Sequence, residues 1–420
     1  MSFSTPKPLQ YDSLKIVLLY INANIRLQVS VHMPSLQKTE KLVPLKIIEL
    51  VLKEYGLSVD GYNYEIVLKR VGRGGPVFED VNGDLDRYGF QVSLPSRVLT
   101  PGDILLCPHG LQEESVRLVD ESKKSERYWP FIERELKLIN LKMKLTQNPE
   151  QYRNELNNAL RWLAPFENLR NNKSHTDNCY TQLTVSAQNS VKGVYRAKYT
   201  SPLFQGMKYL TTKFFENREP IHVNHLSFEG WVSRLPVGVK FRVQQFKTHY
   251  MFVLQESLPP ILVGDIENLI LDLCNGHPED FKSKIVQNAS RLTISRTIFT
   301  GTGASWSSAL QPLRNKTIIL NVGRHENFKT LDMIRLVNHW IEDGREVGTR
   351  FEARSKQRTF SERIFENLKK EFAGYLNNGS WIIVPMVDQT SIVIQYKEID
   401  KDEHGNLFSI IMESVENVDL

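Results

Sequence analysis

Residues 266–274 read IENLILDLC and follow the spacing of a leucine-rich repeat. Ile266, Leu269, Leu271 and Cys274 occupy the first four consensus positions of L-x-x-L-x-L-x-x-N/C. Each repeat of this kind contributes one short strand, and its apolar side is buried only when the neighbouring repeats stack on it. The stretch therefore predicts one turn of a repeat-like domain built from strands and helices.

Short apolar cores recur on both sides of this stretch. They are HLSFEG at 225, FRVQQF at 241, RLTIS at 291 and TIILNV at 317. These four segments share only the central apolar pair of the consensus, so we expect a degenerate and irregular array. Two amphipathic helices should follow, the first ended by Gly344 and the second beginning near Thr359. Three further strand-like runs predict a closing meander.

The N-terminal part of the chain changes its periodicity twice. Apolar residues at i, i+3, i+4 and i+7 predict a short helix, followed by one or two more before residue 43; they are Leu14, Val17, Leu18 and Ile21. Asp60-Gly61 between two β-rich runs predicts a hairpin turn, and GFQVSL and GDILLC would extend that sheet. Two charged helices with apolar stripes, one from Ile132 and one from Tyr152, should follow.

The predicted fold class is therefore mixed, α+β or α/β. We expect short N-terminal helices in residues 1–43, a small antiparallel β module in 44–110 and a charged helical spacer in 111–175. An irregular leucine-rich-repeat-like domain of strands and helices should occupy 176–420. A chain of 420 residues is long enough for several such cores.

The composition of the chain limits which partners and compartments we expect. The 53 basic and 48 acidic residues leave a net charge of only +5, which makes a nucleic-acid partner improbable. We expect no membrane partner, because no run approaches the ~18 apolar residues of a membrane span, and we expect a cytoplasmic or nuclear protein, because no secretory signal is visible. Three widely spaced cysteines argue against a disulfide framework.

The chain shows no motif of a known catalytic class, so we predict a non-enzymatic protein without a cofactor. One set of residues has types that suit zinc, as H-x-x-H and C-x-x-H, and makes a zinc-dependent protein a further alternative: His222, His225, Cys274 and His277. Such short spacings also arise by chance. The other reading is two histidines beside a strand and a cysteine in the core of a repeat.

Residues 9–36 resemble an F-box, with the apolar helix around Leu18 followed by Arg26, Ser30 and MPSL. The F-box is a degenerate one, since Pro8 precedes Leu9 and no aromatic residue lies between 30 and 43. The longer stretch PLQYDSLKIVLLYINANIRLQVSVHMPSLQKTEKLVPLKI, from residue 8, is similar to a nematode-expanded family of uncharacterised proteins grouped with F-box proteins as the F-box C group. LDRYGF, LTPGDILL, VNHLSFEG, LPVGVKFRV and VNHWIEDGREVGTRFE extend the resemblance along the chain.

The resemblance implies a substrate adaptor of a cullin ubiquitin ligase, whose N-terminal helices bind a Skp1-type adaptor protein while the C-terminal domain captures an unknown target protein. Leu14, Val17, Leu18 and Ile21 would supply the spacing that helix docking needs. Two alternatives stay open. The same stripe can pack on the sheet that follows it, and the repeats can serve as a protein-binding scaffold with no link to ubiquitin.

Overall fold

The computed structural model describes residues 11–71, 78–81, 83–92, 99–106, 130, 133–134, 136–144, 152–174, 179–250, 254, 258–272, 275–276, 278–295, 298–299, 305–323, 328–373, 375–377, 379–387, 389–402 and 405–416. These residues form two compact units. Unit 1 comprises Met1–Leu52, Asn217–Phe228 and Gly238–Leu420, and unit 2 comprises Lys53–Glu216 and Glu229–Val237. Within the described ranges, no helix is long and apolar enough to cross a membrane.

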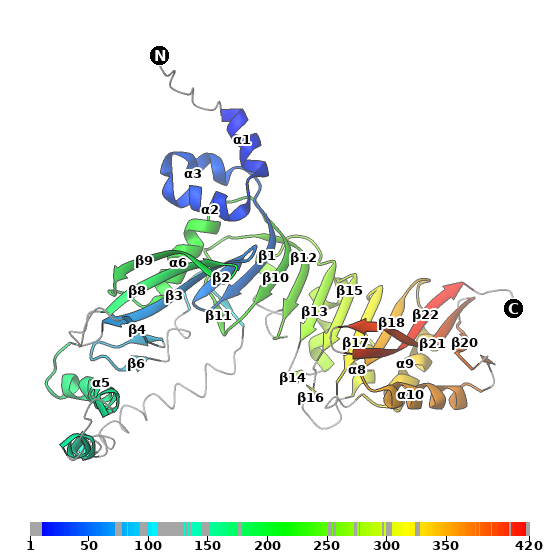
Figure 1. Ribbon diagram of the computed structural model, residues 1–420. Coiled ribbons are helices and arrows are strands. Elements are labelled where there is room, and N and C mark those ends of the chain that lie inside the picture. Colours follow the sequence, from blue (N-terminus) through cyan, green and yellow to red (C-terminus); the bar gives the residue numbers. More distant parts are fainter. Residues whose placement is uncertain are drawn as a thin grey trace. The chain divides into compact units, whose positions relative to one another are not determined.

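Unit 1 begins with three short helices, α1 (Tyr11–Tyr20), α2 (Ala23–His32) and α3 (Pro34–Lys41), so the predicted helical start is confirmed (Figure 1). Asn22 separates the first two, because its side chain accepts a hydrogen bond of 2.8 Å from the N–H of Asn24 and caps α2. Pro34 occupies the first turn of α3, where its missing N–H costs nothing.

The body of unit 1 is a sheet whose strands run parallel and lie side by side. Its strands are β1 (Lys46–Lys53), β10 (Ile221–Phe228), β12 (Phe241–Thr248), β13 (Asn268–Asp272), β15 (Arg291–Ser295), β17 (Thr317–Val322) and β18 (Arg350–Ser355). Consecutive strands of this series pair in parallel. All five strands expected from the recurring apolar cores are present and adjacent, which confirms the repeat-like sheet.

Two ladders of buried side chains hold the parallel strands together. The first ladder is in register from strand to strand: Leu50, Leu226, Phe246, Leu269, Leu292, Ile318 and Phe351. The second lies two residues later: Leu52, Phe228, Thr248, Leu271, Ile294, Leu320 and Ala353. Since each strand is only five to eight residues long, burial of these ladders supplies the stability that a single strand lacks.

The array is more regular than the sequence suggested. A buried residue also stands three positions before the first ladder, in the first place of L-x-x-L-x-L: Ile47, Val223, Val243, Ile266, Ala289 and Asn315. At this place Asn315 donates from its Nδ2 to the carbonyls of Val286 and Ala289, at 2.7 and 2.6 Å, in the preceding repeat. Three of the four segments therefore carry one more apolar position of the consensus than the sequence analysis recognised, and the fourth has the polar Asn315 there.

Helices and a meander complete unit 1. The helical segments are η4 (Pro259–Ile261), η5 (Pro278–Lys282), α7 (Lys284–Asn288), α8 (Trp306–Leu310), α9 (Thr330–Asp343) and α10 (Arg358–Glu371). Gly344 ends α9 with a φ of 69°, as predicted. Strand β22 (Gly405–Glu416) pairs antiparallel with β18 and leads into the predicted meander of β21 (Thr390–Asp402), β20 (Trp381–Pro385) and β19 (Leu376–Asn377). A two-stranded pair joins β14 (Asn275–Gly276) to β16 (Ile298–Phe299).

Unit 2 is inserted in the chain between β1 and β10 and contains an antiparallel sheet. Its order is β2 (Gly56–Val59), β3 (Tyr62–Val71), β8 (Cys179–Ala187) and β9 (Ser190–Lys198), with β4 (Phe78–Val81) also paired to β3. Asp60 and Gly61 form the predicted hairpin turn with φ values of 48° and 78°. The other two expected strands form separate pairs, β5 (Asp84–Leu85) with β6 (Gln91–Val92) and β7 (Ile104–Leu105) with β11 (Val232–Ser233).

One helix packs on this sheet, and two further helical segments form a small core of their own. Helix α6 (Leu203–Phe215) packs on β3, where the rings of Tyr64 and Phe214 meet edge to face at 5.2 Å. Helix α5 (Arg153–Arg170) and the helical residues 136–144 realise the predicted apolar stripes. Leu136 and Leu163 are buried between them, with Leu156, Leu160 and Phe166 packed around.

Candidate protein-binding surfaces

A buried ionic cluster in unit 1 fixes the N-terminal helices. The Glu40 carboxylate, on α3, is completely buried and accepts a hydrogen bond of 3.0 Å from Arg26 Nε, on α2. Arg218, just before β10, donates to both oxygens of Glu40, at 2.9 and 2.5 Å. One carboxylate thus contacts two buried guanidinium groups, the arrangement in which charged hydrogen bonds are strongest.

The Arg26 guanidinium also binds backbone. Its nitrogens donate to the carbonyls of Glu40, Val43 and Pro44, at 3.1, 2.7 and 2.8 Å. These carbonyls lie where the chain leaves α3 and enters β1. Burial lowers the pKa of Arg26 despite the adjacent Glu40 carboxylate. Helices α2 and α3 are therefore joined to the start of the first strand of the repeat array through a polar core.

The residues predicted to bind a partner do not share one environment. Leu18 is only 1% exposed and packs inside the three-helix module, and Leu14 and Ile21 are half-buried beside it. Among the four predicted residues, only Val17 is exposed. The i, i+3, i+4, i+7 stripe is thus mainly the inner side of α1.

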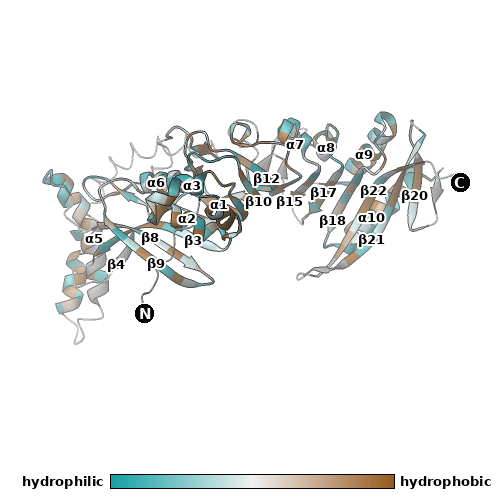
Figure 2. Ribbon diagram, turned by 90° about the horizontal axis from the view of Figure 1, so that it is seen from above, coloured by the Kyte–Doolittle hydropathy of each residue, from teal (hydrophilic) through white to brown (hydrophobic). Residues whose placement is uncertain are grey.

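The opposite side of α1 is also apolar, and it is exposed. Ile16, Leu19 and Tyr20 lie on it at helical spacing, and Tyr20 is 86% exposed. Figure 2 shows the hydrophobic colouring of α1. We call Ile16, Leu19 and Tyr20 the outer α1 face. Sequence reasoning missed it because a search for one amphipathic stripe stops at the first face, whereas KIVLLYI is apolar all round.

The parallel strands present a polar side. In register along it stand Gln245, Asn268, Arg291, Thr317 and Arg350, which we call the polar strand face. Asn268 donates to Gln245 Oε1 at 2.9 Å, and further along the strands Asn321 donates to Ser295 Oγ at 2.8 Å. These contacts hold the side chains in place across neighbouring repeats.

Glu352 organises the C-terminal end of that face. Its carboxylate accepts hydrogen bonds from Arg354 Nε at 2.8 Å, from Ser409 Oγ at 3.0 Å and from Arg350 at 3.3 Å. Burial alone would raise the pKa of Glu352, but the bonds and charge of Arg354, with Ser409 and Arg350, hold its pKa below the ordinary value. The two arginines remain partly exposed, and Arg350 also pairs with Glu413 at 3.9 Å, so the charges at this end of the face are ordered and balanced.

The metal-like residues are described only in part. His222 and His225 lie on β10, whereas Cys274 and His277 fall outside the described residues. In the described part of the chain, no three His, Cys, Asp or Glu side chains gather as metal ligands would. His222 stands in register between Lys46 and Arg242, and burial together with these two cations lowers its pKa. Two adjacent positive charges oppose the binding of a dication there.

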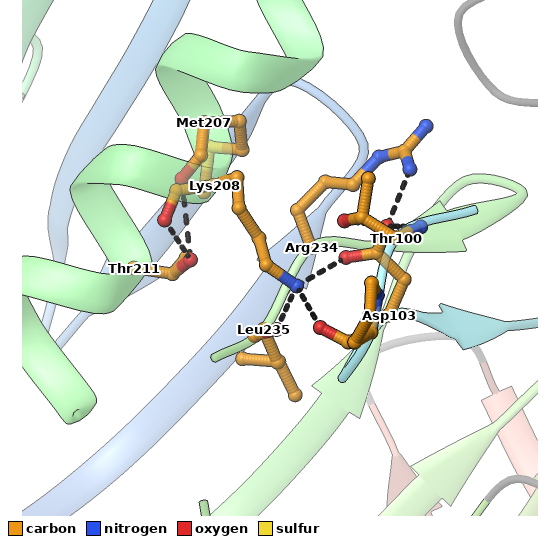
Figure 3. A network of polar contacts seen from close by, with 8 residues as sticks. Thr100, Asp103, Met207, Lys208, Thr211, Arg234 and Leu235 are labelled. Carbon is orange, nitrogen blue, oxygen red and sulfur yellow. Dashed lines mark hydrogen bonds and ion pairs between the residues drawn. The ribbon is translucent and has the colours of Figure 1, made fainter. Parts of the chain in front are cut away.

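A second buried carboxylate organises unit 2. Asp103 accepts hydrogen bonds from Arg234 at 2.6 Å, from Lys208 Nζ at 2.8 Å and from the N–H and hydroxyl of Thr100, at 2.8 and 2.7 Å (Figure 3). Lys208 also donates to the carbonyls of Pro101 and Leu235. The cluster ties α6 and β11 to the LTPGDILL segment. Sequence reasoning marked GDILLC as a strand and LTPGDILL as part of the resemblance, but it could not find the cluster, because Lys208 and Arg234 are far from Asp103 in the chain.

Gly102 allows that segment to approach β11 closely. Its φ is 92°, and a Cβ at this position would lie 2.7 Å from backbone atoms of Leu235, Pro236 and Val237. Any other residue would therefore be strained and would displace the backbone that Asp103 and Lys208 hold.

The comparisons with known proteins add one finding. No curated protein and no solved structure matches the chain. A family model matches the part of the chain from the start of α6 through β18. Over residues 202–357 the chain is similar to a family described as a domain of unknown function, DUF3557.

Proposed function

We propose that this protein is a non-catalytic, F-box-like substrate adaptor of a cullin ubiquitin ligase. In this proposal the three N-terminal helices bind a Skp1-type adaptor protein and the repeat array binds a target protein. The resemblance of residues 9–36 to an F-box and of the longer chain to the nematode F-box C group supports it. So does the architecture of unit 1, in which a small helical module is joined to an array of repeats.

The observation that carries the proposal is the outer α1 face. A patch of exposed apolar side chains on one side of a helix is typical of a site that binds another protein. Ile16, Leu19 and Tyr20 supply i, i+3 and i+4 anchors, the spacing that a helix presents to an apolar groove. Aromatic residues such as Tyr20 are also typical of the centre of an interface.

The polar strand face supports the second half of the proposal. Repeat proteins present their strands or helices as an extended surface on which several repeats contact one partner. Here hydrogen bonds between side chains of adjacent strands preorganise that surface, which reduces the entropy lost on binding.

Binding of the purified chain to a purified Skp1-type adaptor protein tests the proposal by calorimetry. The Leu19→Glu, Tyr20→Glu double variant should weaken binding at least 100-fold, because both charges would be buried in the contact. Val387→Glu is the matched control: Val387 is an equally exposed apolar residue of unit 1 outside the helical module, and it should change binding less than twofold. Leu18→Glu is unsuitable, since a buried charge would unfold the module itself.

Two results would count against the adaptor proposal. One is the absence of binding by the parent chain at 100 μM adaptor protein, a concentration chosen to reveal even weak contacts. The other is equal weakening by the double variant and by Val387→Glu. Either result would leave the repeat array as the functional part and favour a protein-binding scaffold without a link to ubiquitin.

A further inference from the structure

Strand β9 forms one end of the antiparallel sheet in unit 2. It pairs with β8 from Ala187–Ser190 to Tyr180–Lys198, and in the described part of the chain no other strand pairs with it. The second edge of β9 therefore presents a row of backbone donors and acceptors. Such an edge is a template for another strand.

The side chains of β9 are unusually exposed for a strand. Eight of its nine residues are exposed, among them Val191 at 62%, Val194 and Tyr195. The strand contains no proline, which would remove a backbone donor from the edge. An open edge with exposed β-branched and aromatic residues needs either protection against pairing or a partner that pairs with it.

The charges on β9 decide between possible partners. Lys192, Arg196 and Lys198 are basic, and the strand has no acidic residue. Lys192 lies at a bulge in the ladder with β8, so the regular part of β9 is Gly193–Lys198. If two copies paired antiparallel about Ala197, Arg196 of each copy would face Lys198 of the other. Directly opposed like charges disfavour that pairing, whereas opposite charges favour it. The charges on this edge thus disfavour pairing with β9 of a second chain and favour pairing with an acidic strand.

The alternation of side chains between the two sides of β9 indicates the sequence pattern of the partner. Arg196 and Lys198 are in register with Gln182 and Tyr180 on one side of the sheet, while Tyr195 and Ala197 are in register with Leu183 and Thr181 on the other. We propose that β9 binds an extended segment of a partner protein that alternates acidic and apolar residues. The acidic residues lie opposite Arg196 and Lys198, and the apolar residues lie opposite Tyr195 and Ala197.

This proposal does not rest on the proposed adaptor function. Strand β9 belongs to unit 2, whereas the outer α1 face and the polar strand face belong to unit 1. If the chain does not bind a Skp1-type protein, the proposal for β9 still stands. If β9 binds no peptide, the proposal for the outer α1 face still stands.

The test uses the full chain and a fluorescent ten-residue peptide of alternating Glu and Val. Fluorescence anisotropy should show saturable binding, and hydrogen exchange should show new protection of the β9 amides in the complex. A control peptide of the same sequence, N-methylated at every residue, keeps its charge but has no N–H on either edge, so it cannot form the ladder of a paired strand. It should bind at least tenfold more weakly.

The matched protein variants reverse two charges each. Lys192→Glu with Lys198→Glu should weaken binding of the Glu-Val peptide at least tenfold, and circular dichroism should show an unchanged fold because both side chains are exposed. Lys46→Glu with Arg242→Glu, two exposed residues of unit 1, should change it less than twofold. Equal binding of the N-methylated peptide, or no new protection in β9, would overturn the proposal. Dimers of the chain alone with protected β9 amides would overturn it in favour of a second copy.

Discussion

Glu40 in unit 1 and Asp103 in unit 2 are both buried carboxylates paired with cations, but the exposure of their partners differs. Each is a fully buried carboxylate that contacts two cationic side chains, and each joins segments that are far apart in the chain. Around Glu40 both partners are buried arginines. Around Asp103 one partner is the buried Arg234, but the other is Lys208, whose side chain is 21% exposed.

This difference determines what happens when the carboxylate is lost. A buried ion pair adds little net stability compared with apolar packing, but removal of one partner leaves an uncompensated charge in the core. Neither arginine at Glu40 can reach water without local unfolding. Lys208 needs only a small movement to become hydrated. The comparison therefore predicts unequal costs for chemically equal substitutions.

The largest effect should follow Glu40→Ala. We expect it to lower the free energy of unfolding of unit 1 by about 3 to 5 kcal/mol, because Arg26 and Arg218 would remain buried without an anion. Urea unfolding followed by tryptophan fluorescence reports on this unit, since Trp306 and Trp340 are buried in it. Hydrogen exchange should locate the loss in α2, α3 and β1.

Glu352→Ala serves as a control for that measurement. Its two arginines lie partly in water, so it should cost clearly less than Glu40→Ala. Equal costs for the two variants would mean that the depth of burial of the arginines does not govern the penalty, and the comparison would fail.

A smaller effect should follow Asp103→Ala. We expect a loss of about 2 to 4 kcal/mol, confined to unit 2, because Arg234 stays buried while Lys208 can be hydrated. Exchange of amides in α6 and residues 99–106 measures it. Adding Lys208→Met should make the loss no worse, whereas a further large loss would show that Lys208 contributes to stability without Asp103.

The smallest effect should be on the pH dependence of the stability of unit 2. Burial alone would raise the pKa of Asp103, but hydrogen bonds from Lys208, Thr100 and Arg234 hold it below 3.8. A lowered folded-state pKa stabilises the fold above the unfolded pKa, and this stabilisation is lost as the pH falls through the folded value. Unit 2 should therefore weaken below about pH 4, and Asp103→Asn should flatten that dependence. Urea midpoints between pH 2.5 and 7 measure it.

Asp84 provides an internal contrast for the acid experiment. Burial raises its pKa, against hydrogen bonds from the N–H of Leu203 and the hydroxyl of Tyr199. Its contribution has the opposite sign: stability is lost as the pH rises from the ordinary pKa to the raised one. Asp84→Asn should thus steepen the rise of stability with pH. The same direction of change in both variants would contradict the assignment.

Local sequence patterns predicted much of this fold. The parallel array could be anticipated from IENLILDLC because the spacing L-x-x-L-x-L places Ile266, Leu269 and Leu271 on the buried side of a strand that needs neighbours. Asp60-Gly61 predicted its turn because few other residue pairs adopt two successive positive φ values. These features depend on residues that are close together in the chain.

Features that join distant residues could not be predicted in this way. LKIIELVL, residues 45–52, carries the repeat spacing, yet its parallel partner β10 begins only at residue 221, after the whole of unit 2. Glu40 and Asp103 resemble any surface carboxylate until their partners are known. The outer α1 face was missed for another reason: a helix with apolar residues all round gives no periodic signal for its exposed side.

The insertion of unit 2 also governs the order in which the chain can fold. Strands β12 to β17 follow one another closely, so their pairing requires only short loops to close. Lys46 and His222 pair across 176 positions, and a contact of such long range forms slowly because its closure costs more entropy. During synthesis α1 to α3 leave the ribosome first, but they gain Arg218 and β10 only after unit 2 has emerged. The first strand of the array therefore has no partner strand until the whole of unit 2 has been made, and during that interval exposed apolar side chains of α1 favour aggregation or chaperone binding.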